Sequence, residues 1–452
     1  MLPARALRAA PLVLGGAFAV VALARCSRRS GPQQKAHRVA VVGAGFAGLE
    51  AARWLSRTPG VRVTVLDQHN HHLFQPLLYQ VATAALSPDD IASPIRGLLV
   101  RRGTLKVLME QVTGIDLPAR EVLCGGKRVR YDTLVIATGS QPSYFGHDSW
   151  KDAAPSLKTL DDALDLRRRI LSAFEEAAVA QADKARRECL LTFVLVGAGP
   201  TGVEMAGSIA ELAHDMLSHD FRNVGEMRAR VILVEAGPRV LGHFPPDLSA
   251  RAARDLQDMG IEIRTGTEVT TINPGQVRLG SESITAGTVI WTAGVTATPV
   301  AQWLGIAPDK QGRGPVGPDL QARGRPGVYV IGDAALVHDR GGTPLPGLAP
   351  VAKQQGRYVA RAIRRRLRGR PSLGAFVYRD YGELATIGRN RAVAAFGALH
   401  LEGFVAWITW AVAHIFFLIG FRNRVLVSAQ WLMSYITRRR GGRVIIRNAG
   451  TG

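Results

Sequence analysis

The chain has 452 residues, 47% of them hydrophobic, which is enough for two or three domains with proper cores. Its 57 Lys and Arg residues outnumber 36 Asp and Glu, and the net charge of +21 suits a nucleic acid or an anionic membrane surface. Arginine clusters flank apolar segments at both ends and no aromatic-interleaved basic motif occurs, which favours an anionic lipid surface and argues against nucleic acid. Three separated cysteines exclude a disulfide framework, a thiolate zinc site and an iron–sulfur cluster.

The N-terminal extension, residues 1–36, combines arginines with an apolar run from about Ala9 to Ala24. This pattern fits a signal-type segment or a marginal anchor, and an uncleaved anchor would leave the catalytic part in the cytoplasm. An Arg-rich mitochondrial presequence and a wrongly assigned start codon remain open alternatives for the same segment.

A dinucleotide-binding fingerprint follows directly. An apolar strand, Val39–Val42, leads into Gly43, Gly45 and Gly48 at G-x-G-x-x-G spacing, and a helical pattern starts at once. Glycines let a pyrophosphate approach the backbone N–H groups at the positive end of a helix. The acid expected to bind a ribose hydroxyl is Asp67, at the end of the next strand.

Two further signals belong to this first unit. Residues 69–72 include three histidines, but no carboxylate or thiol recurs at ligand spacing, so we expect no metal and interpret the loop as cofactor-lining. The apolar segment Tyr131–Ala137 ends in Thr138 and Gly139, a small-residue turn that lets backbone approach a nucleotide.

The fingerprint is then repeated. A helical segment, Asp161–Ala180, precedes Gly197, Gly199 and Gly202, and the following strand ends in Glu235. An acid at that position binds a free 2′-hydroxyl and repels a 2′-phosphate, so we predict NADH over NADPH. Glu204, in the first turn of the second helix, either offsets the helix dipole or contacts the nicotinamide end of the cofactor.

A third strand, Gly327–Ile331, ends in Gly332 and Asp333, where an acid can bind the ribityl hydroxyls of a flavin. Because it follows the second nucleotide unit, the first domain is expected to be discontinuous, with the second inserted in it. A helix with Pro350 in its first turn follows, and its N-terminus can face the flavin pyrimidine.

The tail differs in kind. Residues 404–421 are apolar apart from His414, and residues 425–437 continue with Trp431 and Tyr435. The length permits one spanning helix. Arginine clusters after each half, ending in Arg438–Arg440, favour helices lying in the membrane interface instead.

Taken together, these segments resemble the type II NADH dehydrogenases, the single-subunit, non-pumping NADH:quinone oxidoreductases of the pyridine nucleotide-disulfide oxidoreductase superfamily. The resemblance spans about residues 37–447. The general motifs are VAVVGAGFAGLEAA, YDTLVIATGS, VLVGAGPTGVEMAG, WTAGV and VYVIGDAA; the more specific ones are HHLFQPLLYQVAT, LAPVAKQQGRYVA, TIGRNRAVA and the aromatic–Arg tail.

The resemblance assigns residues to two cofactors and a quinone. The FAD-binding residues it implies are Gly43, Gly45, Gly48, Asp67, Thr138, Gly139, Gly332, Asp333 and Ala349. The NADH-binding residues it implies are Gly197, Gly199, Gly202, Glu235 and Gly294. Glu204, Lys353 and Gln354 are the implied catalytic residues, and Arg391 falls where the family often has a basic residue near the quinone. The family's Ala-Gln-x-Ala-x-Gln quinone motif aligns with 349–354, but Pro350 replaces its first Gln.

The expected architecture is α/β, with two Rossmann-like domains and a C-terminal membrane-associated helical region. We expect FAD-binding parts at 37–155 and 291–375, an NADH-binding domain at 156–290, and a membrane-anchoring region at 376–452. The implied reaction passes a hydride from NADH to FAD and two electrons to a membrane quinone. The expected location is peripheral, on the cytoplasmic side of the inner or cytoplasmic membrane, with a mitochondrial alternative, and a homodimer is a family expectation.

Rival readings are weighed by what the chain contains. Disulfide and sulfide:quinone reductases need paired reactive cysteines, which Cys124 and Cys189 do not supply. Soluble ferredoxin-type reductases have no need of the Arg-flanked apolar tail. A flavoprotein with another acceptor, or a low-turnover NADH sensor, remains the alternative.

Overall fold

The computed structural model describes residues 36–99, 104–180, 182–221, 228–437 and 441–445. The predictions for residues 1–35 and for Arg438–Arg440 lie outside these ranges.

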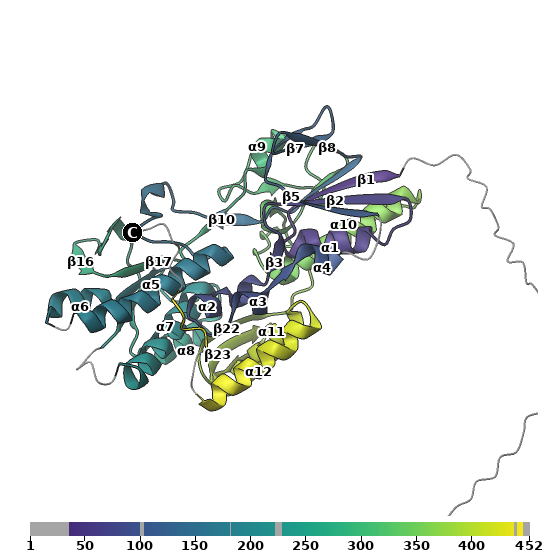
Figure 1. Ribbon diagram of the computed structural model, residues 1–452. Helices are drawn as coiled ribbons and strands as arrows, with labels where there is room; N and C mark the ends of the chain where they lie inside the picture. Colours follow the sequence, from purple (N-terminus) through teal and green to yellow (C-terminus); the bar gives the residue numbers. More distant parts are fainter. Residues whose placement is uncertain (1–35, 100–103, 181, 222–227, 438–440, 446–452) are drawn as a thin grey trace, which may run out of the picture. The chain divides into compact units, whose positions relative to one another are not determined.

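The first large sheet has five strands in the order β20–β9–β1–β2–β5, all parallel (Figure 1). Every residue of β9 is buried, as expected for an apolar strand in a sheet covered on both faces. Strand β20 comes after the second large sheet in the chain, yet it pairs with β9. The strands are β1 His37–Val42, β2 Val61–Asp67, β5 Leu105–Met109, β9 Thr133–Ile136 and β20 Val328–Val330.

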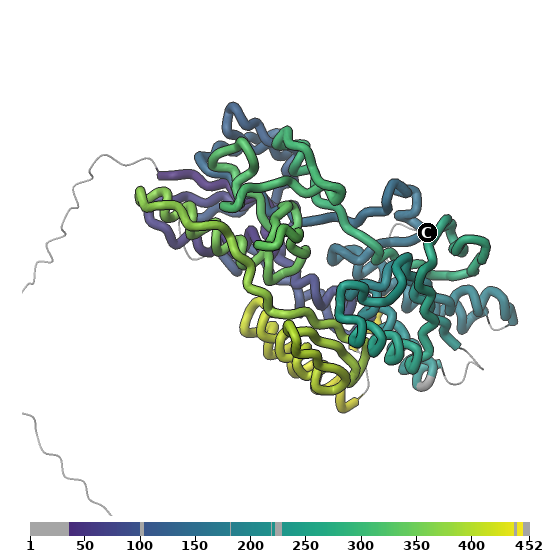
Figure 2. The backbone as a smooth tube through the Cα atoms, turned by 180° about the vertical axis from the view of Figure 1, so that it is seen from behind, coloured from purple at the N-terminus to yellow at the C-terminus, as the bar shows by residue number. Residues whose placement is uncertain are grey.

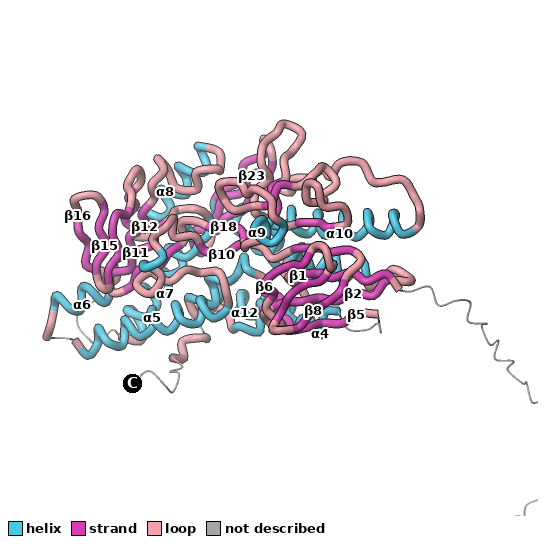
Figure 3. Tube along the Cα trace, turned by 90° about the horizontal axis from the view of Figure 1, so that it is seen from above, coloured by secondary structure: helices cyan, strands magenta, loops and turns pink. Residues whose placement is uncertain are grey.

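The second large sheet has four parallel strands in the order β13–β12–β11–β17. Its central strand β11 is buried at every position. Seen from above in Figure 3, α5 and α7 run along the strands of this sheet. The strands are β11 Thr192–Val196, β12 Arg230–Val234, β13 Glu262–Arg264 and β17 Thr288–Trp291. These two sheets confirm the predicted α/β class with parallel, Rossmann-like sheets.

Helices cover both sheets and join them. The long helices begin close to where the sequence predicted them: α5 starts at Leu160, one residue before the predicted Asp161, and α10 starts with Pro350 in its first turn. A capping box at Thr159 precedes α5. The helices are α1 Phe46–Leu55, α2 Leu78–Ala82, α3 Pro88–Ile91, α4 Ile95–Leu99, α5 Leu160–Val179, α6 Lys184–Leu190, α7 Pro200–His219, α8 Pro246–Asp258, α9 Val300–Leu304, α10 Ala349–Leu367, α11 Gly403–Phe417 and α12 Phe421–Thr437.

Smaller sheets complete the fold. Among the described residues, three of them are three-stranded and antiparallel, including the sheet at residues 383–402 that is described below, and three are two-stranded. The strands of the other small sheets are β3 His71–Leu73, β4 Ala92–Pro94, β6 Val112–Asp116, β7 Glu121–Cys124, β8 Lys127–Arg130, β10 Ser140–Pro142, β14 Val269–Asn273, β15 Gln276–Leu279, β16 Glu282–Thr285, β18 Val295–Ala297, β19 Gly314–Pro315 and β21 Ala335–Leu336.

The sequence analysis expected a helical C-terminal region, but the structure also contains a sheet there. A three-stranded antiparallel sheet precedes α11, formed by β22 Glu383–Gly388, β23 Arg391–Phe396 and β24 Leu399–Glu402. Strand β22 packs so closely on α7 that a Cβ on Gly207 would lie 1.7 Å from the Ile387 carbonyl oxygen. Figure 2 shows the yellow helices lying against these strands.

The apolar segment 404–421 is divided between two helices. Helix α11 ends at Phe417, the chain turns through Gly420 at a φ of +91°, and α12 starts at Phe421. None of the helices in the described ranges combines the length and the apolar character that a membrane span requires.

Candidate active site

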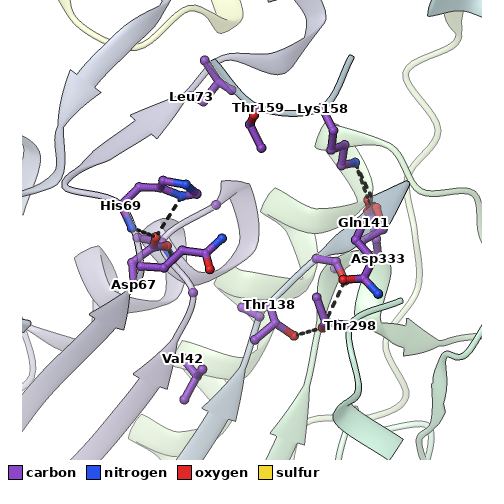
Figure 4. A pocket seen from close by; sticks show the side chains of 18 of the residues that line it. Val42, Asp67, His69, Leu73, Thr138, Gln141, Lys158, Thr159, Thr298 and Asp333 are labelled. Atoms are coloured by element: carbon purple, nitrogen blue, oxygen red, sulfur yellow. Dashed lines mark hydrogen bonds and ion pairs between the residues drawn. The ribbon is translucent and has the colours of Figure 1, made fainter. Parts of the chain in front are cut away.

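The first cavity has a volume of about 670 Å³ and lies at the carboxyl ends of the first sheet's strands (Figure 4). Its wall includes Val42 and Asp67, the last residues of β1 and β2, and Thr138 and Gly332, which follow β9 and β20. Ligands of open parallel sheets bind at this edge, where helix N-termini and loops converge.

The glycine loop forms the floor of this cavity. Gly43 has a φ of +95°, and a Cβ there would lie 2.3 Å from the Ala137 carbonyl oxygen, so only glycine fits the turn. Gly45 also lines the cavity, and nothing lies within 4 Å of where its Cβ would be. A ligand can therefore approach the backbone at Gly45 directly. Asp67 orders the loop by accepting the Ala44 N–H at 2.6 Å and the His69 N–H at 2.8 Å.

The opposite wall is a hydrogen-bonded cluster, shown in Figure 4. The hydroxyls of Thr138 and Thr298 lie 2.5 Å apart. Ser140 donates to Asp333 at 2.8 Å, and the Lys158 ammonium donates to Ser140 at 2.9 Å. Burial lowers the pKa of Lys158, while the charge of Asp333 acts in the opposite direction.

Helix α10 starts at Ala349 and contributes Ala352 to the cavity wall. Buried Gln355 accepts the backbone N–H of Gly332 at 2.6 Å and so ties this helix to the turn before Asp333. Gly139 and Gly332 have φ values of +72° and +70°, which places two left-handed turns on this side of the cavity.

Gln354 contacts a different part of the chain from its neighbour Gln355. Its amide bonds both backbone groups of Arg379, donating at 2.8 Å and accepting at 3.0 Å. It is absent from the residues that line the described cavities. The side chain of Gln354 therefore contacts the 379–382 segment, at Arg379.

Lys353 lies between two aromatic rings, 5.3 Å from the centre of Phe46 and 5.2 Å from that of Phe417. Its ammonium donates to the Phe417 carbonyl at 3.3 Å. Burial lowers the pKa of Lys353 to about 8, partly opposed by Glu50. The side chain therefore links α10 with the end of α11.

The second cavity, of about 590 Å³, repeats the geometry of the first. Gly197 has a φ of +102°, and Glu235 accepts the Ala198 N–H at 2.7 Å. Gly199 and Gly294 line the same cavity, but Gly202 packs under the loop and is absent from the lining.

The third cavity, of about 780 Å³, lies between α7 and the C-terminal helices. Aromatic side chains line it: Tyr79, Phe404, Trp407, Trp410, Trp431 and Tyr435. Glu204 projects from α7 into this wall and is 9% exposed. Burial raises the pKa of Glu204 to about 8, partly opposed by the Thr386 backbone N–H and the Trp410 indole. Glu204 therefore lies with the C-terminal helices and not in the glycine-lined second cavity.

Two further residues singled out in the sequence, Arg391 and His72, form hydrogen bonds within the fold. Arg391 donates to the Asp255 carbonyl at 2.9 Å and lies 3.5 Å from Asp258, at the end of α8. His72 is buried, and its Nδ1 meets the Ala44 carbonyl at 2.9 Å. Among the described residues, no group of three or more metal-binding side chains gathers in one place.

Several cavity residues escaped the sequence analysis. Lys158 and Thr298 carry no motif of their own, and only the Thr159 capping box beside Lys158 marks a fixed position. The first cavity brings together most of the residues that the sequence assigned to FAD, namely Gly43, Gly45, Asp67, Thr138, Gly139, Gly332 and Asp333. Glu204, Lys353 and Gln354 do not meet in any one described cavity.

The chain is similar to protein families and to individual proteins that are already known. Residues 37–356 match the model of the pyridine nucleotide-disulphide oxidoreductase family, and residues 381–440 match that of the NDH2 C-terminal domain. Two Mycobacterium tuberculosis proteins, the type II NADH:quinone oxidoreductases Ndh and NdhA, are each 42% identical to this chain. The alignments cover 90% of this chain, with 89% of Ndh and 88% of NdhA.

A solved structure shares the fold. NDH2 from Plasmodium falciparum in complex with NADH superposes with a TM-score of 0.82 over 91% of this chain and 100% of that chain, at 18% identity.

Proposed function

This chain belongs to the pyridine nucleotide-disulphide oxidoreductase family and, within it, to the type II NADH:quinone oxidoreductases, and from this premise we propose which residues serve each part of the reaction. Its activity is the oxidation of NADH by a quinone. The division into an FAD-binding domain (37–155 and 291–375) with an inserted NADH-binding domain (156–290) is supported by the pairing of β20 with β9.

The first cavity fits FAD. The open backbone at Gly45 suits a pyrophosphate, Asp67 lies where a ribose hydroxyl would bind, and Asp333 lies on the opposite wall, where ribityl hydroxyls would bind. When bound, FAD supplies the hydride-accepting and electron-donating chemistry. The protein's own contribution is to orient that group and to set the charges around it.

The second cavity fits NADH. Gly197, Gly199 and Gly294 leave backbone open, and Glu235 occupies the position of a ribose-binding acid. Its negative charge would repel a 2′-phosphate, which supports NADH as the substrate over NADPH.

Helix α7 contributes residues to two of the cavities. Its N-cap, Gly199, lines the second cavity, and Glu204, one turn further on, lines the third. Quinone reduction consumes two protons for two electrons. With a pKa of about 8, Glu204 holds a proton on its carboxyl group at neutral pH, and we assign it the role of a proton donor on the quinone side.

Lys353 and Gln354 belong to the same side in this proposal. Lys353 presents its ammonium between Phe46 and Phe417, where it can orient a quinone oxygen. Gln354 acts indirectly: it holds the backbone at Arg379, and Tyr381 in that segment has its ring 6.5 Å from that of Phe417. Gln354 is thus a positioning residue.

The outer faces of α11 and α12 support peripheral attachment to a membrane. Residues 403–437 contain no Asp or Glu. Large apolar side chains are exposed on both helices: Phe404, Val405, Ile408, Val412, Phe416, Phe421, Val425, Leu432, Met433 and Ile436. With Arg422 and Arg424 in the first turn of α12, this composition suits an anionic interface on the cytoplasmic side. A homodimer stays an expectation from the family.

The attachment proposal needs a test that leaves the core intact. Trp410 and Val427 are buried in the main hydrophobic cluster, so deleting the tail would open the core. We would instead substitute three exposed residues, Val405, Val412 and Met433, with serine and measure flotation with anionic vesicles. Loss of flotation, with normal turnover of a soluble quinone analogue, is expected. Unchanged flotation would exclude this face as the attachment surface.

The role of the quinone separates this proposal from the alternatives. FAD-loaded, detergent-solubilised protein should oxidise NADH steadily only when a short-chain ubiquinone analogue is added. Reduction of bound flavin by NADH without reoxidation by quinone would favour another acceptor or a sensing role.

A further inference from the structure

Lys158 is the only Lys or Arg among the described residues that line the first cavity. Four acids share that lining: Asp67, Glu110, Asp161 and Asp333. A dinucleotide brings two phosphate charges into this surrounding. A single fixed cation in such a wall therefore has a large electrostatic effect on whatever binds beside it, since screening by water is weak in a partly buried site.

The backbone at Lys158 is held on both sides. Its N–H donates to Asp162 at 2.9 Å, in the capping box that starts α5, and its carbonyl accepts from Gln75 at 3.1 Å. The position of the side chain therefore follows from the fold and does not depend on a mobile loop.

The ammonium group is aimed at the flavin side of the cavity. Its Nζ donates to Ser140 at 2.9 Å and lies 3.9 Å from the Asp333 carboxylate (Figure 4). Only 21% of the side chain is exposed. An ammonium has three N–H donors, and Ser140 and Asp333 are the two described groups that it meets. It can therefore donate to a bound group as well.

The order of the residues along the cavity indicates which part of a bound FAD Lys158 would contact. Asp67, at the end of β2, marks the adenosine end, and the backbone at Gly45 marks the pyrophosphate. Asp333 lies on the far wall with Lys158 beside it, so Lys158 belongs to the ribityl and ring end. A flavin ring carries more negative charge after reduction than before, and a nearby cation stabilises that form.

We propose that Lys158 sets the reduction potential of the flavin bound in this cavity, by supplying a fixed positive charge at its ring end. This inference rests on the proposed placement of FAD in the first cavity. It makes Lys158 an electrostatic positioning residue, with no bond made or broken at its ammonium.

The test compares Lys158→Met, which keeps the length and removes the charge, with Lys158→Arg, which keeps the charge. Lys184→Met, on exposed α6, is the matched control. The potential of bound FAD is measured on each full-length protein in excess FAD, by slow reduction against a reference dye. Lys158→Met should shift the oxidised-to-reduced equilibrium at least tenfold toward the oxidised form, about 30 mV for two electrons. Lys158→Arg and Lys184→Met should stay near the wild type.

An unchanged potential in Lys158→Met would overturn the proposal, and so would equal loss of affinity for oxidised and reduced FAD, since both mean a purely structural role. Lys158→Gln provides a second neutral variant if Lys158→Met is poorly folded. Failure of the FAD placement itself is distinguishable, because Asp67→Asn and Asp333→Asn would then leave the FAD content of the purified protein unchanged.

Discussion

The two fingerprint cavities have the same local construction and different walls. Both start from a glycine in a left-handed turn and an acid that accepts the next backbone N–H, at 2.6 Å from Asp67 and 2.7 Å from Glu235. The first cavity is then closed by the Ser140–Asp333–Lys158 cluster, whereas backbone glycines and Arg239 line the second. From this difference we infer that the shared loop serves phosphate binding, and that the added wall determines whether the proposed nucleotide is retained or exchanged.

The strongest way to break this comparison is to fill each loop in turn. A Cβ at Gly48 or at Gly202 would lie 1.9 Å from the carbonyl oxygen of Gly43 or Gly197. Gly48→Val should remove bound FAD and abolish all activity. Gly202→Val should keep FAD and raise the KM for NADH roughly 10- to 100-fold, because overpacking costs about 1–3 kcal/mol. Flavin absorbance and initial rates measure both, and loss of FAD from Gly202→Val would show that the two sites are not independent.

The next contrast lies along α7, between the end proposed for NADH at Gly199 and the end proposed for the quinone at Glu204. Glu204→Gln should lower quinone-dependent turnover roughly 100-fold or more, the usual contribution of a positioned acid, while reduction of bound flavin by NADH changes little. The wild-type rate should also fall as the pH rises through about 8, where Glu204 loses its proton. Rapid-mixing measurements separate the two half-reactions, and equal slowing of both would remove the proposed role.

Glu204 also affects stability. Its pKa is raised from 4.5 to about 8 in the folded chain, so the folded state binds the proton more tightly. The stability due to this group is present below pH 4.5 and is lost as the pH rises through 8, by about 1.4 kcal/mol per unit. Denaturant unfolding of Glu204→Gln should show this part of the slope removed, and parallel profiles would contradict the buried, protonated state.

A smaller effect should distinguish the two ribose-binding acids. Glu235→Ala removes the charge that repels a 2′-phosphate, so the ratio of kcat/KM for NADPH to that for NADH should rise about tenfold, or about 1.4 kcal/mol. Asp67→Ala should weaken FAD retention without changing this ratio. A coenzyme ratio that moves with Asp67 and not with Glu235 would reverse the assignment of the cavities.

The smallest expected effect concerns Gln354. Gln354→Ala loses two hydrogen bonds to Arg379, each contributing about 1 kcal/mol, and should lower the free energy of unfolding by about 1–2 kcal/mol. The KM for quinone should rise only two- to threefold, on the order of 0.5 kcal/mol. A much larger rise, with stability unchanged, would instead indicate direct contact with the quinone. Arg361→Ala, at an exposed position on the same helix, is the control.

Much of the fold could be predicted because its signals are local. Gly43 and Gly197 stand between a buried strand and a helix, and that order alone defines a strand–turn–helix unit. The sheet β22–β24 was missed because β23 is rich in alanine, a poor strand former, and because the sheet is attached to an apolar tail that resembles a membrane segment. Its stability comes from packing on α7 at Gly207, a contact between distant parts of the chain.

The site could be predicted only where backbone geometry defines it. Glycine spacing is typical of a phosphate loop, but adjacent helical residues point about 100° apart, so a motif that contains Gln354 and Gln355 does not reveal that Gln355 bonds the Gly332 backbone while Gln354 bonds Arg379. Lys158 escaped for a related reason: its role depends on Asp333, 175 positions further along, and no periodic pattern records that proximity.

The C-terminal helices complete contacts with segments near the start of the fold. Trp431 donates to Gln80 across 351 residues, and Asn423 reaches the Asp89 carbonyl across 334. During synthesis at about 5–20 residues per second, α2 and α3 therefore wait tens of seconds for their partners to leave the ribosome. The main hydrophobic cluster, which includes Trp410 and Val427, is complete only with the last helix, so a chain released early exposes that cluster to proteases.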